Sequence, residues 1–367
     1  NHSYPKVIAM KVIGLMSGTS VDGVDAALVE ITGHRENINI TLIAAETYPY
    51  PESLQAEILA LCAGKALRMA EFCELDDAIA QHFTQCAQQL ETATATTAEL
   101  IGSHGQTLFH RPPQKTLGYS LQLGRGAMIA HLSQRPTVSN FRAADIAQKG
   151  QGAPLVPKVD ACLLSHPTQV RCVQNIGGIS NVTYLPPRSQ PNWEDKILGW
   201  DNGPGNSLLD LAVQRLTNGK KRYDDQGQWA AQGTPHPELL QQWLEADFFQ
   251  HPPPKSTGRE LFGAAYFDQL WQQAQDCTLS PADFLATLTE LTVSAIAQDY
   301  QTFLPQLPNT ILLCGGGSRN QYLQQRLQRK FPQIAIQATD EVGLDSHAKE
   351  AIAFAVLAYW RYCDQFP

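Results

Sequence analysis

Two apolar runs near the start of the chain flank a short polar turn, and this arrangement constrains the fold more than any other feature of the sequence. The runs cover residues 11–13 and 26–31 and predict two neighbouring strands. The segment between them includes Gly18 to Asp25, with two glycines, two hydroxyl residues and two aspartates in eight positions. We therefore expect a hairpin whose turn carries polar chemistry.

The residue types in this turn suit a bound phosphate. Glycine backbone N–H groups can point toward an anion, and the hydroxyls of Thr19 and Ser20 add donors. The carboxylates of Asp22 and Asp25 can hold Mg²⁺, directly or through water. We interpret the turn as a nucleotide phosphate site, although not a Walker A loop, because it contains no lysine. A polar hairpin turn without a ligand is the structural alternative.

The composition is that of a globular enzyme and excludes several classes of partner. The 367 residues are enough for two domains, and 43% of them are hydrophobic. A net charge of −8 argues against nucleic acid and anionic membranes as partners. There is no apolar run of transmembrane length, and the eight cysteines form no Cys-x-x-Cys pair. We therefore expect a cytoplasmic protein with reduced thiols and no structural metal site.

Strand and helix signals alternate along the chain, which is typical of α/β proteins. A buried strand is predicted at 99–103, just before the polar segment 104–107. From residue 170 onward a strand, a Gly177-Gly178 turn, a second strand at 179–185 and a third at 197–200 repeat the plan of the N-terminal region. Two such halves facing one another would form a central cleft, the usual place for a ligand.

Asp201 follows the last of these predicted strands and precedes a rigid Gly-Pro-Gly turn. A carboxylate held firmly at a sheet edge can take a proton from a water or hydroxyl nucleophile. We therefore single out Asp201 as a candidate general base. The structural alternative is a residue whose side chain only shapes an Asx turn.

Two further glycine turns favour contact with a nucleotide. Gly315, Gly316 and Gly317 join a strand to a helix predicted to begin at Ser318, so a base or ribose can approach the backbone. The Gly177-Gly178 turn is a stronger candidate when it is considered together with the Gly18 to Asp25 turn, because two opposed glycine turns can bind one polyphosphate chain from both sides. Plain connecting turns are the structural alternative for both.

Several polar residues lie in segments without a general chemical signature. Arg142 can bind a carboxylate in bidentate fashion, and a structural Arg142–Asp145 pair is the alternative. His104 has the ordinary interpretation of a hydrogen-bonded histidine. Glu350, near the start of the final helix, has that of a solvated acid that stabilises the helix dipole.

Taken together, five segments resemble the anhydro-N-acetylmuramic acid kinases, a family within the superfamily of sugar kinases, heat-shock ATPases and actin. The motifs run in family order, and the resemblance covers essentially the whole chain from Met10 onward. The segments are Gly14 to Asp25, Ser103 to Thr107, Asn140 to Pro157, Gly199 to Asn206 and Cys314 to Asn320.

The resemblance implies a two-domain, actin-like ATPase fold of the ribonuclease H-like type, with a central interdomain cleft. We expect domain I to comprise 10–135 plus 340–367, with the final helix packing back onto it, and domain II to comprise 136–339. The implied reaction uses water to open the 1,6-anhydro ring of 1,6-anhydro-N-acetylmuramic acid and phosphorylates O6 with ATP. The product, N-acetylmuramate 6-phosphate, belongs to peptidoglycan recycling.

The resemblance also assigns roles to individual residues, with ATP and Mg²⁺ as cofactors. Asp201 becomes the base that deprotonates the attacking water. Asp22 becomes a contact of the metal ion, directly or through a water molecule. A homodimer is the family's expectation, and the small amino sugar is the substrate. The implied nucleotide contacts are Gly18, Thr19, Ser20, Val21, Asp22, Gly23, Val24, Asp25, Gly177, Gly178, Gly315, Gly316 and Gly317. The implied sugar contacts are His104, Gln106, Arg142, Asp145 and Glu350.

Two rival functions stay open on the sequence alone. One is a kinase that acts on another sugar or on a carboxylate. The other is a chaperone-like ATPase of the same superfamily, which would turn over ATP without any sugar.

Overall fold

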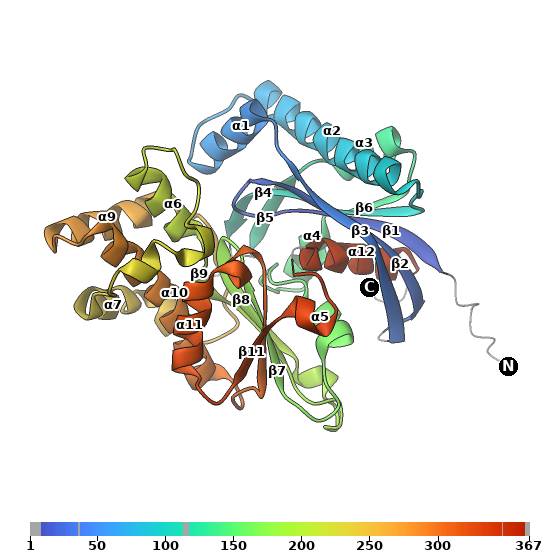
Figure 1. Ribbon diagram of the computed structural model, residues 1–367. Helices are drawn as coiled ribbons and strands as arrows, with labels where there is room; N and C mark the ends of the chain where they lie inside the picture. The colour runs from blue at the N-terminus through green and yellow to red at the C-terminus, as the bar shows by residue number, and fades with distance from the viewer. Residues whose placement is uncertain (1–8, 36, 112, 114–116, 347, 364–367) are drawn as a thin grey trace. The chain divides into compact units, whose positions relative to one another are not determined.

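The structure is a computed structural model that describes residues 9–35, 37–111, 113, 117–346 and 348–363 (Figure 1). The chain divides into two compact units. Unit 1 comprises Asn1–Leu163 with His347–Pro367, and unit 2 comprises Leu164–Ser346. Each unit contains one β-sheet with helices packed against it.

Unit 1 is built on a sheet of six strands in the order β3-β2-β1-β4-β5, with β6 paired to β4. Its strands are β1 (Met10–Ser17), β2 (Gly23–His34), β3 (Asn37–Pro49), β4 (Leu100–Arg111), β5 (Tyr119–Leu123) and β6 (Thr137–Ser139). Its helices are α1 (Glu52–Cys62), α2 (Met69–Thr94), α3 (Gly126–Ser133), α4 (Phe141–Ala147), α5 (Pro157–Leu164) and α12 (Lys349–Tyr362).

The alternation of side chains along β1 explains how helices cover both faces of this sheet (Figure 1). Ile13 and Leu15 pack in the core that includes α2. Gly14 lies between them in sequence and faces α12, where a Cβ atom would come 1.8 Å from the carbonyl oxygen of Ala351. A glycine is therefore needed for the final helix to lie directly on β1, and that helix belongs to unit 1.

Unit 2 combines a five-stranded sheet with a helical region. Its strands are β7 (Arg171–Ile176), β8 (Ile179–Leu185), β9 (Leu198–Pro204), β10 (Thr310–Cys314) and β11 (Ala335–Ala338). Its α-helices are α6 (Ser207–Leu216), α7 (Pro237–Leu244), α8 (Asp247–Gln250), α9 (Ala264–Asp276), α10 (Pro281–Phe303) and α11 (Gln321–Lys330). Its 3₁₀ turns are η1 (Glu194–Lys196), η2 (Asp225–Gly227), η3 (Ala230–Gln232), η4 (Gly316–Arg319) and η5 (Thr339–Val342).

The two sheets share one topology, as the repeated plan in the sequence predicted. In unit 1 an antiparallel meander β1-β2-β3 is extended from β1 by the parallel strands β4 and then β6. In unit 2 the antiparallel meander β7-β8-β9 is extended from β7 by the parallel strands β10 and then β11. Two copies of one α/β unit in a single chain agree with the two-domain, actin-like architecture and confirm the α/β class.

The units divide later in the chain than the sequence-based boundaries at 135/136 and 339/340. β6 pairs with β4, which ties the segment after residue 136 to the first sheet. Asp160 of α5 forms a buried ion pair with Lys349 of α12, which ties the end of that segment to the final helix. Ser346 accepts a hydrogen bond from the backbone of Gly315, so the second boundary also moves later.

Across the residues that the structure describes, no helix combines the length and apolar character that crossing a membrane requires.

Candidate active site

The turn between β1 and β2 is held from behind by residues of β4 and α1. The Ser17 hydroxyl lies 2.7 Å from Oε1 of Gln106, its neighbour in the β1–β4 pairing. The Gln106 amide donates to the carbonyl of Gly18 at 3.3 Å, and the Gln55 amide donates to that of Val21 at 2.7 Å. Gln106 is completely buried, so the structure places this predicted sugar contact behind the turn.

The exposed part of the turn is shorter than the sequence suggested, because β2 already begins at Gly23. Val24 is fully buried in the core, and Asp25 accepts a hydrogen bond from the hydroxyl of Thr47 at 2.6 Å, directly opposite on β3. Gly23 to Asp25 are therefore strand residues. Of the two aspartates, Asp22 is the exposed one.

Val21 lies within this turn in a conformation that β-branched residues rarely adopt. Its φ is +59°, in the left-handed region, and its side chain is buried. Such strain persists only where the surroundings over-determine it, and it gathers at ligand-binding turns. Thr19 and Ser20 beside it are half-buried.

His104 forms the centre of a polar network inside unit 1. Its Nδ1 lies 2.8 Å from the carbonyl oxygen of Gly105, which can only accept, so Nδ1 carries the hydrogen. Nε2 consequently accepts the hydrogen bond from Nε of Arg142 at 3.0 Å. Burial, and then the charge of Arg142, hold the pKa of His104 well below its usual range. The imidazole is therefore neutral. It packs against the ring of Phe354, with 4.6 Å between the two ring centroids.

Arg142 and Asp145 hold the same loop residue from two sides. Nη1 of Arg142 donates to the carbonyl of Gly152 at 2.6 Å, and Oδ2 of Asp145 accepts from the Gly152 N–H at 2.6 Å. Gly152 has a φ of +75°, which favours glycine. A Cβ atom on Gly150 would come 2.2 Å from the Asp145 carboxylate. This segment, predicted to belong to domain II, therefore forms part of unit 1.

Glu350 is not the solvated acid that its position at a helix start suggested. Glu350 is half-buried, and its pKa is raised by that burial. The charges of Lys349 and Arg142 offset only part of this increase. Lys349 in turn makes a buried ion pair with Asp160, at 2.8 Å from Nζ to Oδ1. The structure thus brings Glu350 into the same charged neighbourhood as Arg142.

The pKa values of three histidines in this unit, His82, His104 and His110, are lowered by burial, and these shifts predict how its stability depends on pH. Burial and the charge of Arg142 lower the pKa of His104 and bring that of His110 to about 4. Below pH about 6.5 the unfolded chain binds protons that the folded chain excludes. The free energy of unfolding should therefore decrease as the pH is lowered below about 6.5. The decrease is at most about 1.4 kcal/mol per pH unit for each histidine.

Urea unfolding between pH 7.5 and 5 measures this slope. His110→Gln removes one of these groups, so its slope should be shallower than that of the unaltered chain. A free energy of unfolding that stays constant over this range would contradict the assignment.

In unit 2, Asp201 lies within β9 rather than after it, because the strand runs on to Pro204. Its N–H donates to the carbonyl of Lys255 at 3.1 Å, and its Oδ2 accepts from the N–H of Thr257 at 2.8 Å. Only 5% of Asp201 is exposed. The carboxylate thus bonds to a residue 56 positions away, unlike the local bond of an Asx turn. It is a buried acid fixed by long-range contacts.

A buried ion pair supports the segment that contacts Asp201. Nζ of Lys255 lies 2.9 Å from Oδ1 of Asp299 on α10, and both side chains are at most 5% exposed. Oδ2 of Asp299 accepts hydrogen bonds from Nε1 of Trp200 and Nδ2 of Asn202, each at 2.9 Å. The two residues that flank Asp201 in β9 are therefore bound to the same carboxylate. Sequence reasoning missed Lys255, Thr257 and Asp299, since no motif spacing links them to Asp201.

The glycine turns of unit 2 divide into those that packing requires and those that it leaves open. A Cβ on Gly315, whose φ is +77°, would come 2.4 Å from Oδ1 of Asn175, and one on Gly317 would come 2.3 Å from Ile176. On Gly316 the nearest atom would be 3.8 Å away, and on Gly177 it would be 3.5 Å away. Gly177 and Gly316 therefore have room for a neighbouring group.

The segments around these turns are also tied together. The carbonyl of Gly178 accepts from the N–H groups of Gly205 and Ser207, so the β7–β8 turn packs on the start of α6. The 3₁₀ turn η4 begins within the glycine triplet, at Gly316, and α11 begins at Gln321 rather than at Ser318. Asn320 caps that helix by accepting from the N–H of Leu323 at 2.9 Å.

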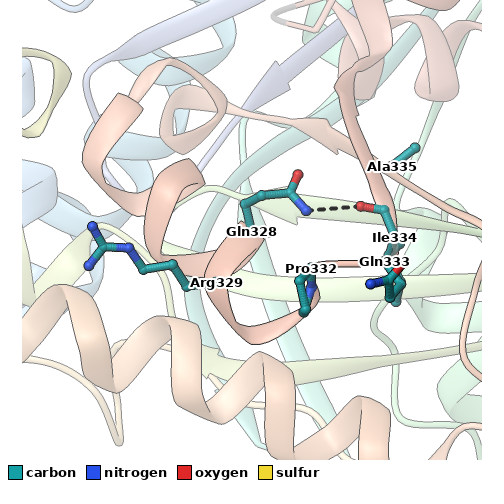
Figure 2. Close-up of a pocket in the computed structure, with 6 residues that line it drawn as sticks. All are labelled: Gln328, Arg329, Pro332, Gln333, Ile334 and Ala335. Carbon is teal, nitrogen blue, oxygen red and sulfur yellow. Dashed lines mark hydrogen bonds between the residues drawn. The ribbon is translucent and has the colours of Figure 1, made fainter.

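A surface hollow of about 590 Å³ lies elsewhere in unit 2 (Figure 2). Gln328 and Arg329 of α11 line it together with 332–335, and the Gln328 amide donates to the carbonyl of Ile334 at 3.1 Å. Ala335 pairs with Thr310 at the start of β10, whereas the glycine triplet follows the other end of that strand. The hollow is therefore not part of the candidate site.

The residues near the first turn fit Mg²⁺ in the way that nucleotide sites usually hold it. No group of three or more His, Cys, Asp or Glu side chains within the described ranges could hold a metal ion by itself. Mg²⁺ in kinases commonly keeps several waters and is bound by one or two carboxylates with the substrate phosphates. The exposed Asp22 suits that role, whereas the Asp25 carboxylate is engaged by Thr47.

Comparison with known proteins places the chain in a family. Residues 10–367 match the family model described as anhydro-N-acetylmuramic acid kinase. A protein of that name from Rippkaea orientalis is 61% identical over 357 residues, which cover 96% of this chain and 93% of the relative. Another from Synechocystis is 60% identical over 363 residues, covering 98% and 94%. The chain, a kinase enzyme, therefore belongs to the anhydro-N-acetylmuramic acid kinase family, as its five motifs predicted.

Proposed function

We propose that the chain opens the 1,6-anhydro ring of 1,6-anhydro-N-acetylmuramic acid with water and phosphorylates the O6 so released. The oxygen of water bonds to the anomeric carbon as the bond between that carbon and O6 breaks, and the water gives up a proton. O6 then takes the γ-phosphoryl group of ATP, and the bond to the β-phosphate oxygen breaks. The products, N-acetylmuramate 6-phosphate and ADP, fit peptidoglycan recycling.

The observation that carries this proposal is the buried carboxylate of Asp201, held by the N–H of Thr257 at 2.8 Å. A buried carboxylate in a fixed orientation can accept the proton of an attacking water, and such general base catalysis contributes about 10²- to 10⁴-fold. One oxygen of Asp201 accepts the Thr257 N–H. The carboxylate can bind a water at the same time, because it has about four acceptor positions.

For ATP, we propose contacts at the glycines that have open space and at the polar turn of unit 1. Gly18, Gly177 and Gly316 can bring backbone N–H groups close to a phosphate or a nucleoside, because packing does not fill the space where a Cβ would lie. Thr19 and Ser20 add hydroxyl donors. Mg²⁺, held by Asp22 directly or through water, would neutralise charge on the transferred phosphoryl group.

For the sugar, we propose the charged network of unit 1 as the binding surface. Arg142 suits the lactyl carboxylate of the substrate, and the half-buried Glu350 suits a sugar hydroxyl. His104 and Asp145 would hold Arg142 and the Gly152 loop in place. Gln106 would support the phosphate turn, since its amide is already bonded to Gly18.

Two further parts of the proposal come from the resemblance. We propose a cytoplasmic location, where ATP is abundant and where the eight free cysteines would stay reduced. We also propose that the enzyme is a homodimer.

The test is product analysis after incubation with ATP, Mg²⁺ and the anhydro sugar in ¹⁸O-water. The expected product is a sugar monophosphate with ¹⁸O at the anomeric position and none between O6 and phosphorus. ADP should form in equal amount and only when the sugar is present. Steady ATP hydrolysis that ignores the sugar would contradict the proposal and favour a chaperone-like ATPase. Phosphorylation of other sugars in preference to this one would favour a different sugar kinase.

A further inference from the structure

Beside Asp201 lies a buried hydroxyl that the structure leaves without a partner. Thr257 is 8% exposed, and within the described part of the chain its Oγ1 has no hydrogen-bond partner. A buried hydroxyl in that state loses its hydration without compensation, so native proteins rarely keep one without a reason. Three other buried hydroxyls share this state, those of Ser103, Ser294 and Thr339. Thr257 differs from them because its own backbone N–H binds the Asp201 carboxylate.

The position of Thr257 relative to Asp201 is set from two sides. The carbonyl of Lys255 accepts a hydrogen bond from the Asp201 N–H at 3.1 Å. Two residues further along the chain, the N–H of Thr257 donates to the Asp201 side chain. The Lys255 ammonium is itself anchored to Asp299 at 2.9 Å. Covalent geometry keeps a threonine hydroxyl within about 4 Å of its own nitrogen. The hydroxyl therefore lies within about 7 Å of the Asp201 oxygen that the Thr257 N–H contacts. One water molecule can touch both oxygens when they lie less than about 5.6 Å apart.

We propose that the Thr257 hydroxyl is a further catalytic group that orients the attacking water together with Asp201; this inference rests on the proposed function. The carboxylate accepts one hydrogen of the water, and Oγ1 of Thr257 accepts the other. The free lone pair of the water then points at the anomeric carbon. As the new C–O bond forms, the proton passes to Asp201, and Thr257 keeps its own proton throughout.

Thr257→Val tests the hydroxyl alone, because valine has nearly the same shape and keeps the N–H that binds Asp201. We expect kcat to fall about 10- to 100-fold, since misplaced reactants cost rates of that order. The KM values for sugar and ATP should change little. The thermal midpoint should stay equal or rise, because a methyl group requires no hydrogen bond. Thr257→Ser restores the hydroxyl and should recover most of kcat.

Ser294→Ala is the matched control, since it removes another unpartnered buried hydroxyl of unit 2. It should leave kcat unchanged. Full kcat in Thr257→Val would overturn the inference, as would a loss of kcat together with thermal stability that Thr257→Ser does not repair. Asp201→Asn, measured alongside, separates the two levels of the argument. If Asp201→Asn is inactive while Thr257→Val is fully active, the proposed function stands and only the role of Thr257 is lost.

Discussion

Asp201→Asn is expected to lower turnover by at least about 10³-fold while leaving nucleotide binding intact, because general bases contribute up to about 10⁴-fold. The amide has the shape of the carboxylate but cannot take a proton from water. Its Oδ1 can still accept the Thr257 N–H that holds the carboxylate at 2.8 Å. The fold around β9 should therefore survive. Steady-state ADP release measures kcat, and calorimetric titration with a non-hydrolysable ATP analogue measures binding.

Asp268→Asn provides the comparison for this experiment. Asp268 is 57% exposed and pairs with Arg215 at the surface of the same unit, so its loss should leave kcat unchanged. Near-normal turnover in Asp201→Asn would remove Asp201 as the base. Loss of nucleotide binding together with turnover would mean that the residue acts on the fold instead.

Asp299→Asn should produce the largest loss of stability among substitutions near the site, about 3–5 kcal/mol in the free energy of unfolding. The charge of Lys255 would remain buried without its counter-ion, since both side chains are at most 5% exposed. Burial raises the pKa of Asp299 and the Lys255 ammonium lowers it, so each charge depends on the other. Removing one member of such a pair is much more costly than removing both.

Two variants separate the buried charge from other effects of this substitution. Adding Lys255→Met to Asp299→Asn removes the unpaired charge, and it should recover part of the lost stability. Asp268→Asn breaks an exposed pair and should cost less than about 1 kcal/mol. Urea unfolding of the variants gives all these values. If Asp299→Asn were as mild as Asp268→Asn, the ion pair would not stabilise the Lys255 segment.

The sequence predicted the elements more reliably than their ends. The sequence pattern places Asp25 in the turn and Asp201 just after a strand, yet both lie inside strands. In each case the strand continues because the neighbouring strand supplies partners, Thr47 for Asp25 and Asn181 for Asp201. A polar residue looks like a turn residue in sequence, but cross-strand pairing can hold it in a sheet.

The candidate site shows the same division. Arg142, Asp145 and Glu350 were singled out by family resemblance, and the structure places them in the charged network of unit 1. The sequence did not point to Lys255 and Thr257, although both residues contact Asp201 directly.

The sequence by itself determined the family, the α/β class, the repeated plan and the polar turn after β1. These depend on local signals: glycine and hydroxyl types in a turn, apolar periodicity and motifs in a set order. Only the tertiary structure decided what surrounds each acid. Asp201 is held by Thr257 from 56 residues away, and Asp160 by Lys349 from 189 residues away. Burial and charge pairing over such separations leave no periodic signal in the sequence, because they arise only when the sheets and helices have packed.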